Sequence, residues 1–275
     1  NDRNMGIPYT CRRGLDFVTG DYLVGASADD IMIPEFFKKF ISLLVQYPQA
    51  GFCVAPHYYT DEKGALLGVS PEAPYYSDTP CYIPPEKALK LLMNKGNFFV
   101  GPASIWRTQA LRESKGWPVE VGEYLDVFGS ILLLFKYGAC FIPEPLGTLR
   151  CHSGNISTIY KSEPEKYLQL VEPVQRLMTS PIYAHIFPPS YVEDVIKRDW
   201  YAFGNIALNK LKEAQSINLE YLNNSLPGSL LDRIFLITVQ FFFKMHQMTS
   251  RFYLFLRLRN LNGFMMALIF YRIKN

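Results

Sequence analysis

Over its first 158 residues the chain alternates short apolar runs with apolar residues at helical spacing, and this alternation most constrains the fold. Repetition of strand and helix along a chain is typical of a sheet with helices packed on its faces. We therefore expect an α/β fold with a mixed sheet flanked by helices. The predicted elements, strand and helix in turn, are 22–28, 34–47, 51–59, 85–94, 98–106, 127–137 and 140–149.

The last of these runs, Cys140–Leu149, contains Pro143 and Pro145. Proline has no backbone N–H to give to a neighbouring strand, so it is found at edges, at strand starts or at bulges. We therefore place this segment at the edge of the sheet or in an extended loop.

From about residue 159 helical patterns dominate and strand patterns are absent. Helices are predicted at 165–178, 190–214 and 230–259, and Pro173 should kink or split the first of them. The expected organisation is an α/β domain over residues 1–158 and an α-helical C-terminal region over residues 159–275.

Composition excludes several classes of protein. With 275 residues, 49% of them hydrophobic, the chain has ample material for a core. A net charge of +3 does not point to nucleic acid as a partner. The five cysteines are scattered without a CxxC pair, which fits a reducing compartment and a cytoplasmic protein. No Gly-x-Gly-x-x-Gly follows a predicted strand, which disfavours a Rossmann-type dehydrogenase.

Two adjacent carboxylates, Asp29 and Asp30, follow the first predicted strand. Ligands of α/β folds gather at the carboxyl ends of strands. A carboxylate pair there can coordinate Mg²⁺ or Mn²⁺ and so neutralise charge on a departing diphosphate. The alternative is that one aspartate caps the helix that Pro34 begins.

A third acid, Asp126, stands just ahead of the predicted helix 127–137, with Glu123 three residues earlier. Such a carboxylate can take the proton from a hydroxyl group that attacks a substrate, if it lies within hydrogen-bond reach. The alternative is an N-cap, a position that aspartate favours.

Arg150 and His152 follow the last predicted strand. A guanidinium and an imidazole at this place can hold a diphosphate or complete a metal shell. The alternative is a solvated loop, since a single Arg-x-His is a weak signal.

The order and spacing of these motifs resemble family 2 glycosyltransferases over about residues 1–158. The first half reads Asn4-Met-Gly6-Ile, Gly14-Leu15, Gly20-Asp21-Tyr22-Leu23 and Ser27-Ala-Asp29-Asp30-Ile-Met-Ile-Pro34. The second half reads Gly101-Pro-Ala-Ser-Ile-Trp-Arg107, Gly116-Trp117, Asp126 with Gly138, Ile142-Pro-Glu-Pro-Leu146 and Arg150-Cys-His152 with Ser157. Each motif alone is weak, but the combined pattern is specific.

The resemblance implies a GT-A-type α/β domain, a divalent metal (Mg²⁺ or Mn²⁺) and a nucleotide-sugar donor. It implies transfer of the sugar, with inversion, to a glycan or lipid-linked acceptor. Carried over by position, Asp29 with Asp30 matches the metal-binding end of the family's D-x-D motif, Asp126 matches the base, and His152 closes around metal and diphosphate. Donor binding is assigned to Asn4, Gly6, Arg150 and His152.

Three features depart from the family pattern. Ser27 replaces the first aspartate of D-x-D, Thr10-Cys11-Arg12 replaces the usual Ala-Arg-Asn, and the family's first nucleotide-binding strands do not precede Asn1. We therefore expect an N-terminally truncated transferase. The rival hypothesis is a non-catalytic, degenerate transferase module that binds a glycan, a membrane or a partner subunit.

The C-terminal segment 230–275 is basic and aromatic, with no acidic residue beyond Asp232. Polar residues at helical spacing draw one narrow stripe on the helix predicted there: Arg233, Gln240, Lys244, Gln247 and Arg251. No uncharged apolar run reaches the roughly 18 residues that a membrane span needs. A helix of this kind can nevertheless lie on the inner face of a membrane. The alternatives are packing onto the α/β domain and dimerisation.

Overall fold

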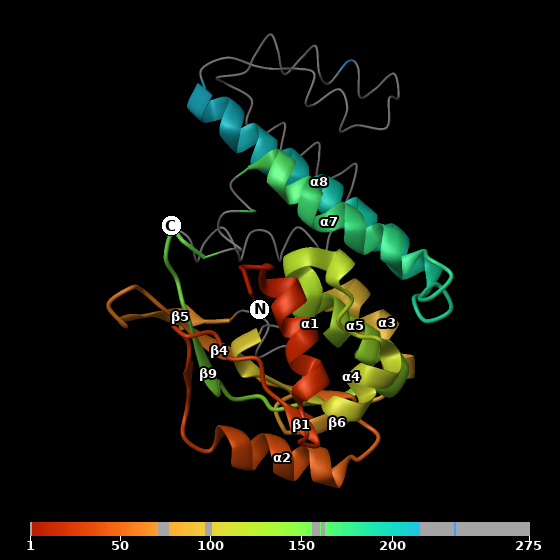
Figure 1. Cartoon of the computed structure of the whole chain (residues 1–275). Helices are drawn as coiled ribbons and strands as arrows, with labels where there is room; N and C mark the ends of the chain where they lie inside the picture. Colours follow the sequence, from red (N-terminus) through yellow and green to blue (C-terminus); the bar gives the residue numbers. More distant parts are fainter. Residues whose placement is uncertain are drawn as a thin grey trace. The chain divides into compact units, whose positions relative to one another are not determined.

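The computed structural model describes residues 2–70, 77–96, 101–155, 160, 163–214 and 234 (Figure 1). By its internal contacts the chain divides into two compact units. The first unit comprises residues 1–153 and 173–192, and the second comprises residues 154–172 and 193–275. The division expected from the sequence, at residue 158, stays a prediction.

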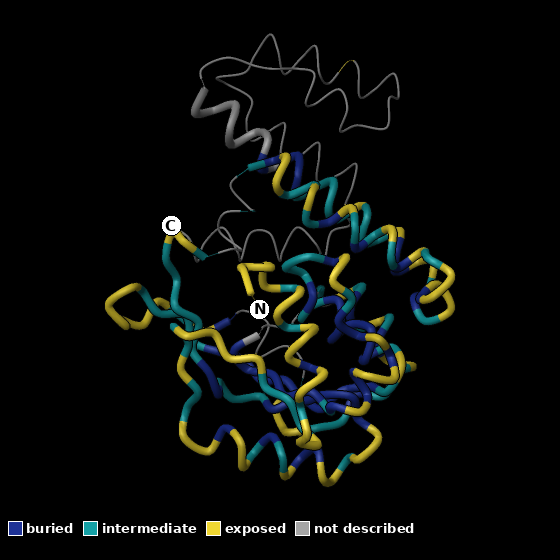
Figure 2. The backbone as a smooth tube through the Cα atoms, in the orientation of Figure 1, coloured by how far each residue is buried: buried dark blue, intermediate teal, exposed yellow. Residues whose placement is uncertain are grey.

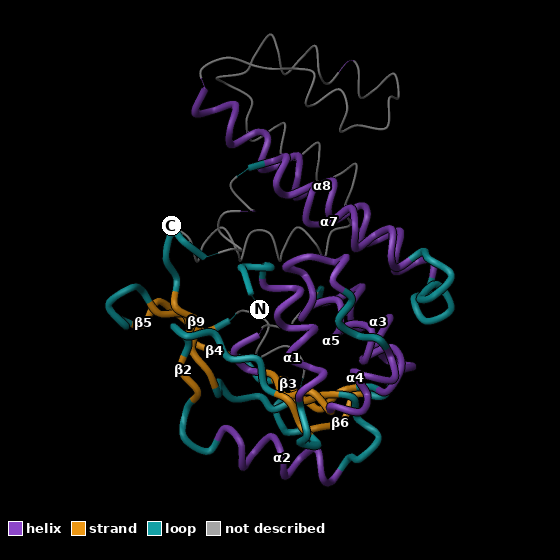
Figure 3. The backbone as a smooth tube through the Cα atoms, viewed as in Figure 1, coloured by secondary structure: helices purple, strands orange, loops and turns teal. Residues whose placement is uncertain are grey.

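The first unit is built on two mixed sheets, which confirms the expected α/β class (Figure 3). The larger sheet has the strand order β1 (Tyr22–Leu23), β7 (Ser104–Arg107), β3 (Phe52–Val54), β8 (Ala139–Phe141), β6 (Cys81–Ile83). The smaller has the order β2 (Ile31–Met32), β9 (Gly147–Arg150), β4 (His57–Thr60), β5 (Leu66–Val69). The pairs β3–β8 and β4–β9 are parallel, and the other pairs are antiparallel.

The chain passes from the larger sheet to the smaller one between β1 and β2, between β3 and β4, and between β8 and β9. Two predicted strands, 51–59 and 140–149, are therefore each split into two. The breaks contain Pro56 in one case and Pro143 with Pro145 in the other, where a missing N–H ends the ladder. The edge placement predicted for 140–149 is wrong, because β8 and β9 each have a neighbour on both sides.

Helices cover both faces of the larger sheet (Figure 1). On one face lies α2 (Phe36–Gln46), whose Phe36, Phe40 and Leu44 are buried in the core beside the strands. On the other lie α3 (Pro85–Lys95), α4 (Thr108–Ser114) and α5 (Leu125–Tyr137). β7 shows the alternation of a buried strand: Ile105 belongs to the core cluster on α2, and Trp106 donates to Ser130 of α5 at 3.0 Å.

Two predicted helix ends are confirmed at glycines. Gly96 ends α3 with φ 79°, and Gly138 ends α5 with φ 73°, which is backbone that favours glycine. At Gly138 a side chain would also collide with the carbonyl of Ile83. Burial is densest around α5 and the larger sheet (Figure 2).

Residues 173–192 pack against α4 and α5 of the first unit. The hydroxyl of Tyr183 donates to the carbonyl of Lys115 at 2.8 Å, and its ring lies 5.2 Å from that of Phe128. Farther along, the rings of Phe135 and Tyr191 are 5.1 Å apart. This aromatic contact explains why a segment predicted for the C-terminal region belongs to the α/β unit.

The predicted helices 165–178 and 190–214 are confirmed as α7 (Pro164–Met178) and α8 (Pro189–Ala214). Pro173 lies inside α7 and does not end it. Within the second unit the hydroxyl of Tyr167 on α7 donates to Asp199 of α8 at 3.0 Å.

The predicted helix 230–259 and the basic segment 230–275 lie outside the described residues, apart from Ile234. Among the helices that are described, none has the length and apolar character needed to cross a membrane. The membrane surface as a partner stays a prediction.

Candidate functional site

The Asp29–Asp30 pair lies in the connection between the two sheets. The strand predicted at 22–28 is only two residues long, so the carboxylates precede β2 and do not end a long strand. β2 pairs with β9 through Ile31 and Thr148, and the amide of Ile31 also donates to the Thr148 hydroxyl oxygen at 3.1 Å. This pairing brings the aspartates beside the end of β9.

The end of β9 carries the other predicted group. β9 runs parallel to β4 with Arg150 opposite Thr60, and the amide of Cys151 continues the ladder by donating to the Thr60 carbonyl at 2.7 Å. His152 follows directly. Its position is therefore fixed by backbone pairing within the smaller sheet.

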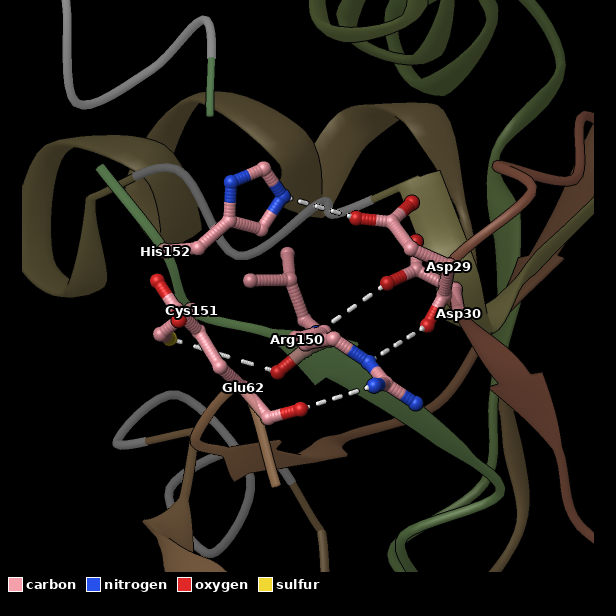
Figure 4. Close-up of polar contacts among 7 residues, drawn as sticks. Asp29, Asp30, Glu62, Arg150, Cys151 and His152 are labelled. Atoms are coloured by element: carbon pink, nitrogen blue, oxygen red, sulfur yellow. Dashed lines mark hydrogen bonds and ion pairs between the residues drawn. The ribbon is translucent and has the colours of Figure 1, made fainter. Parts of the chain in front are cut away.

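His152 and Asp29 meet side chain to side chain. Nε2 of His152 lies 3.0 Å from Oδ2 of Asp29, and the two side chains are 31% and 39% exposed (Figure 4). The hydrogen bond with His152, with a backbone hydrogen bond second, holds the pKa of Asp29 below its usual range. Asp29 is thus an ionised, accessible carboxylate at neutral pH.

Asp30 differs from its neighbour. Burial raises the pKa of Asp30, which is half-buried, and its Oδ1 accepts a hydrogen bond from the amide of Arg150 at 3.2 Å. One aspartate therefore faces the imidazole, and the other ties the turn to β9.

The guanidinium of Arg150 reaches two backbone carbonyls. Nε donates to the carbonyl of Asp29 at 3.2 Å, and Nη1 donates to the carbonyl of Glu62 at 3.0 Å (Figure 4). Glu62 belongs to the turn between β4 and β5. Two segments that are distant from Arg150 in sequence therefore converge on its side chain.

The donor set of Asp29 and His152 fits a divalent cation. In the structure Oδ2 of Asp29 and Nε2 of His152 are joined by a hydrogen bond of 3.0 Å, which a bound ion would replace. Within the described residues no group of three or more Asp, Glu, His or Cys side chains could hold an ion. The pair suits a cation that takes its other ligands from water and a diphosphate.

Asn4 and Gly6, predicted to bind the donor, form the start of α1 (Ile7–Phe17). Oδ1 of Asn4 accepts from the amide of Gly6 at 2.9 Å, and Gly6 has φ 81° at the N-cap. A turn of this kind directs the chain into the helix. Donor binding by these two residues stays a prediction.

Asp126 lies in the first turn of α5, whose N-cap is Tyr124, so Asp126 does not cap the helix. Its Oδ1 accepts from the amide of Val127 at 2.7 Å. Burial raises the pKa of Asp126, which the hydrogen bond only partly offsets. A raised pKa strengthens a carboxylate as a base.

The sequence did not predict that Cys11 of α1 lies near this acid. Burial, and secondly the charge of Asp126, raise the pKa of the Cys11 thiol.

Predicted site residues thus form two groups: Asp29, Asp30, Arg150 and His152 at the smaller sheet, and Asp126 beside α1. The carbonyl of Glu62 was also not predicted, although Asp61-Glu-Lys-Gly64 is a turn sequence that indicates the β4–β5 hairpin.

Comparison with known proteins agrees with the resemblance in the first part of the chain. Residues 1–114 match the family model described as Glycosyl transferase family 2. No curated protein gives a significant match. The two mixed sheets flanked by helices agree with a partial GT-A-like fold. By this match and this fold, residues 1–114 of the chain are similar to a segment of glycosyl transferase family 2.

Proposed function

We propose that the chain transfers a sugar, with inversion, from a nucleotide-sugar donor to a hydroxyl group of a glycan or lipid-linked acceptor. The observation that carries this proposal is the Asp29–His152 pair, at 3.0 Å. A carboxylate and an imidazole that meet beside the Arg150 guanidinium form a place for a diphosphate and its counter-ion.

On the donor side, Asp29 and His152 would hold Mg²⁺ or Mn²⁺. The bound ion would neutralise charge on the leaving diphosphate. Asp30 would keep the turn in place through its bond with the amide of Arg150. Asn4 and Gly6 would contribute to donor binding through the turn that begins α1.

On the acceptor side, Asp126 would act as the general base. The acceptor oxygen attacks the anomeric carbon, the bond from that carbon to the diphosphate oxygen breaks, and the hydroxyl proton passes to the carboxylate. A carboxylate has about four lone pairs, so the hydrogen bond with Val127 leaves capacity for this proton. This role requires that Asp126 and the Asp29–His152 pair face one cleft.

The test is the substitution Asp126→Asn, which keeps size and hydrogen bonding but removes the base. We expect transfer to fall by about 100-fold or more, with binding of the nucleoside diphosphate and Mn²⁺ retained. Transfer is measured as release of nucleoside diphosphate in the presence of acceptor. Transfer at the wild-type rate in the variant would remove Asp126 from this role.

The rival hypothesis of a non-catalytic module rests on Ser27 and Cys11, which depart from the family pattern. It predicts that nucleoside diphosphates do not bind in a Mn²⁺-dependent way. Calorimetric titration with a nucleoside diphosphate, with and without Mn²⁺, separates the two hypotheses when the nucleotide-binding strands expected ahead of Asn1 are restored. Metal-dependent binding supports the transferase.

A further inference from the structure

We propose that Arg150 is a positioning residue that holds the Asp29 carboxylate against the His152 imidazole by tying three backbone segments together. The inference deepens the proposed function, on which its metal-binding consequence rests. It assigns the guanidinium to the protein's own carbonyl groups and makes the tip of the β4–β5 hairpin part of the site.

The first step is the set of bonds that Arg150 makes. Its backbone amide donates to the side chain of Asp30, its Nε to the carbonyl of Asp29, and its Nη1 to the carbonyl of Glu62, at 3.2, 3.2 and 3.0 Å. One residue therefore joins the 29–30 turn, the end of β9 and the hairpin tip (Figure 4).

The second step concerns the direction of Asp29. The two bonds from Arg150 hold both the Asp29 carbonyl and the neighbouring Asp30 side chain, so the backbone of the turn is held at two points directly after the Asp29 Cα atom. If the turn were mobile, the Asp29 carboxylate would lose side-chain and backbone entropy when it meets His152. Because the turn is already fixed in the folded chain, most of this entropy is lost on folding and not on ligand binding.

The third step concerns the hairpin. Oδ1 of Asp61 accepts from the amides of Lys63 and Ala65 at 2.9 and 2.8 Å, which makes the turn compact and presents the Glu62 carbonyl in one direction. Arg150 can therefore use this carbonyl as a fixed point. The planar fork of arginine can donate in two directions at once, which a lysine ammonium on a flexible stem does less well.

The experiment compares Arg150→Met, Arg150→Lys and the control Lys63→Met, which removes one positive charge from an exposed side chain of the same turn. Affinity is measured by titrating the whole chain with MnCl₂ alone. Order in residues 26–31 and 61–65 is measured by hydrogen exchange with peptide resolution, with peptides of α5 as an internal reference.

We expect Arg150→Met to weaken Mn²⁺ binding by about 10- to 100-fold, as for other residues that orient metal ligands. Exchange should become faster in both segments and stay unchanged in α5. Arg150→Lys should recover part of the affinity, and Lys63→Met should resemble the wild type.

Unchanged Mn²⁺ affinity and unchanged exchange in Arg150→Met would overturn the inference. So would a variant that loses only nucleoside diphosphate binding, because Arg150 would then contact the diphosphate directly. If the wild type binds no Mn²⁺ but Arg150→Met still speeds exchange in both segments, the metal role in the proposed function fails and the positioning role stands.

Discussion

Nε2 of His152 lies 3.0 Å from Oδ2 of Asp29, although the two residues are 123 positions apart in the chain. The contact exists because β2 and β9 are antiparallel neighbours in the smaller sheet, so the start of β2, which follows Asp29, lies beside the end of β9, which precedes His152. Neither side chain is fully buried, so the pair is both held by the fold and open to a ligand.

The two adjacent aspartates should respond differently to the same substitution. Asp29→Asn removes an ionised carboxylate that faces His152, and we expect Mn²⁺ affinity to fall by about tenfold or more. Asp30→Asn keeps an amide oxygen that can accept from the Arg150 amide, and we expect most of the affinity to remain. Titration with MnCl₂ measures both. Equal losses in the two variants would contradict the separate roles.

The buried His57 should make the fold sensitive to acid. Its side chain is inaccessible, neither ring nitrogen has a hydrogen-bond partner within the part of the chain that the structure describes, and burial lowers its pKa from 6.5 to about 4. The unfolded chain therefore takes up this proton first as pH falls. The contribution of neutral His57 to the free energy of unfolding is fully present above pH 6.5 and is lost as the pH falls from 6.5 to about 4.

For His57 the expected loss is about 3 kcal/mol in the free energy of unfolding. Urea unfolding at several pH values measures it, and His57→Leu should flatten the curve in this range. The control is His185→Leu, which removes an exposed histidine. If His57→Leu keeps the wild-type slope, another group causes the acid sensitivity.

The neighbourhood of Asp126 and Cys11 can be tested without any substrate. Burial is the main cause that raises the pKa of Cys11, and the negative charge of Asp126 adds to it. Asp126→Asn should lower this pKa and speed alkylation of Cys11 by iodoacetamide at pH 8, by roughly twofold. Peptide mass spectrometry resolves Cys11 from the other cysteines. An unchanged rate of Cys11 alkylation would contradict an electrostatic effect of Asp126 on Cys11 of α1.

Close packing at Gly129 predicts a loss of stability on adding one methyl group. A Cβ atom there would lie 2.7 Å from the carbonyl oxygen of Gly116 and 2.8 Å from the ring of Trp117. We expect Gly129→Ala to cost about 1–3 kcal/mol in the free energy of unfolding. Gly14→Ala, on α1 with no atom within 4 Å of the added Cβ, should be neutral or stabilising by up to about 1 kcal/mol. Chemical unfolding of both variants checks the contrast.

Helices and their ends were predictable from the sequence because their signals are local. Gly96 and Gly138 end helices as expected, and the apolar spacing of α2, α7 and α8 gave their positions. The strands were less predictable. A run such as 51–59 looks continuous in sequence, and only pairing partners decide that it divides at Pro56 between two sheets.

For the site, residue types and the family resemblance predicted that Asp29, Asp30, Arg150 and His152 belong together, and the structure brings these four together. That Asp126 faces the same cleft stays a prediction. The sequence could not assign their separate contacts. That Asp30 accepts from an amide, or that the Arg150 guanidinium reaches Glu62, depends on sheet register and turn geometry. Such contacts leave no pattern in the residue types.

Because the chain crosses between two sheets, the strands that form the buried core and the strands that support the candidate site lie in different sheets. β3 and β8, in the larger sheet, are fully buried, whereas β2, β4, β5 and β9, which support Asp29, Glu62 and Arg150, are mostly accessible. Substitutions that alter ligand preference can therefore accumulate on the smaller sheet without enlarging cavities beneath the larger one. A library confined to the smaller sheet's loops would vary specificity on a scaffold that still folds.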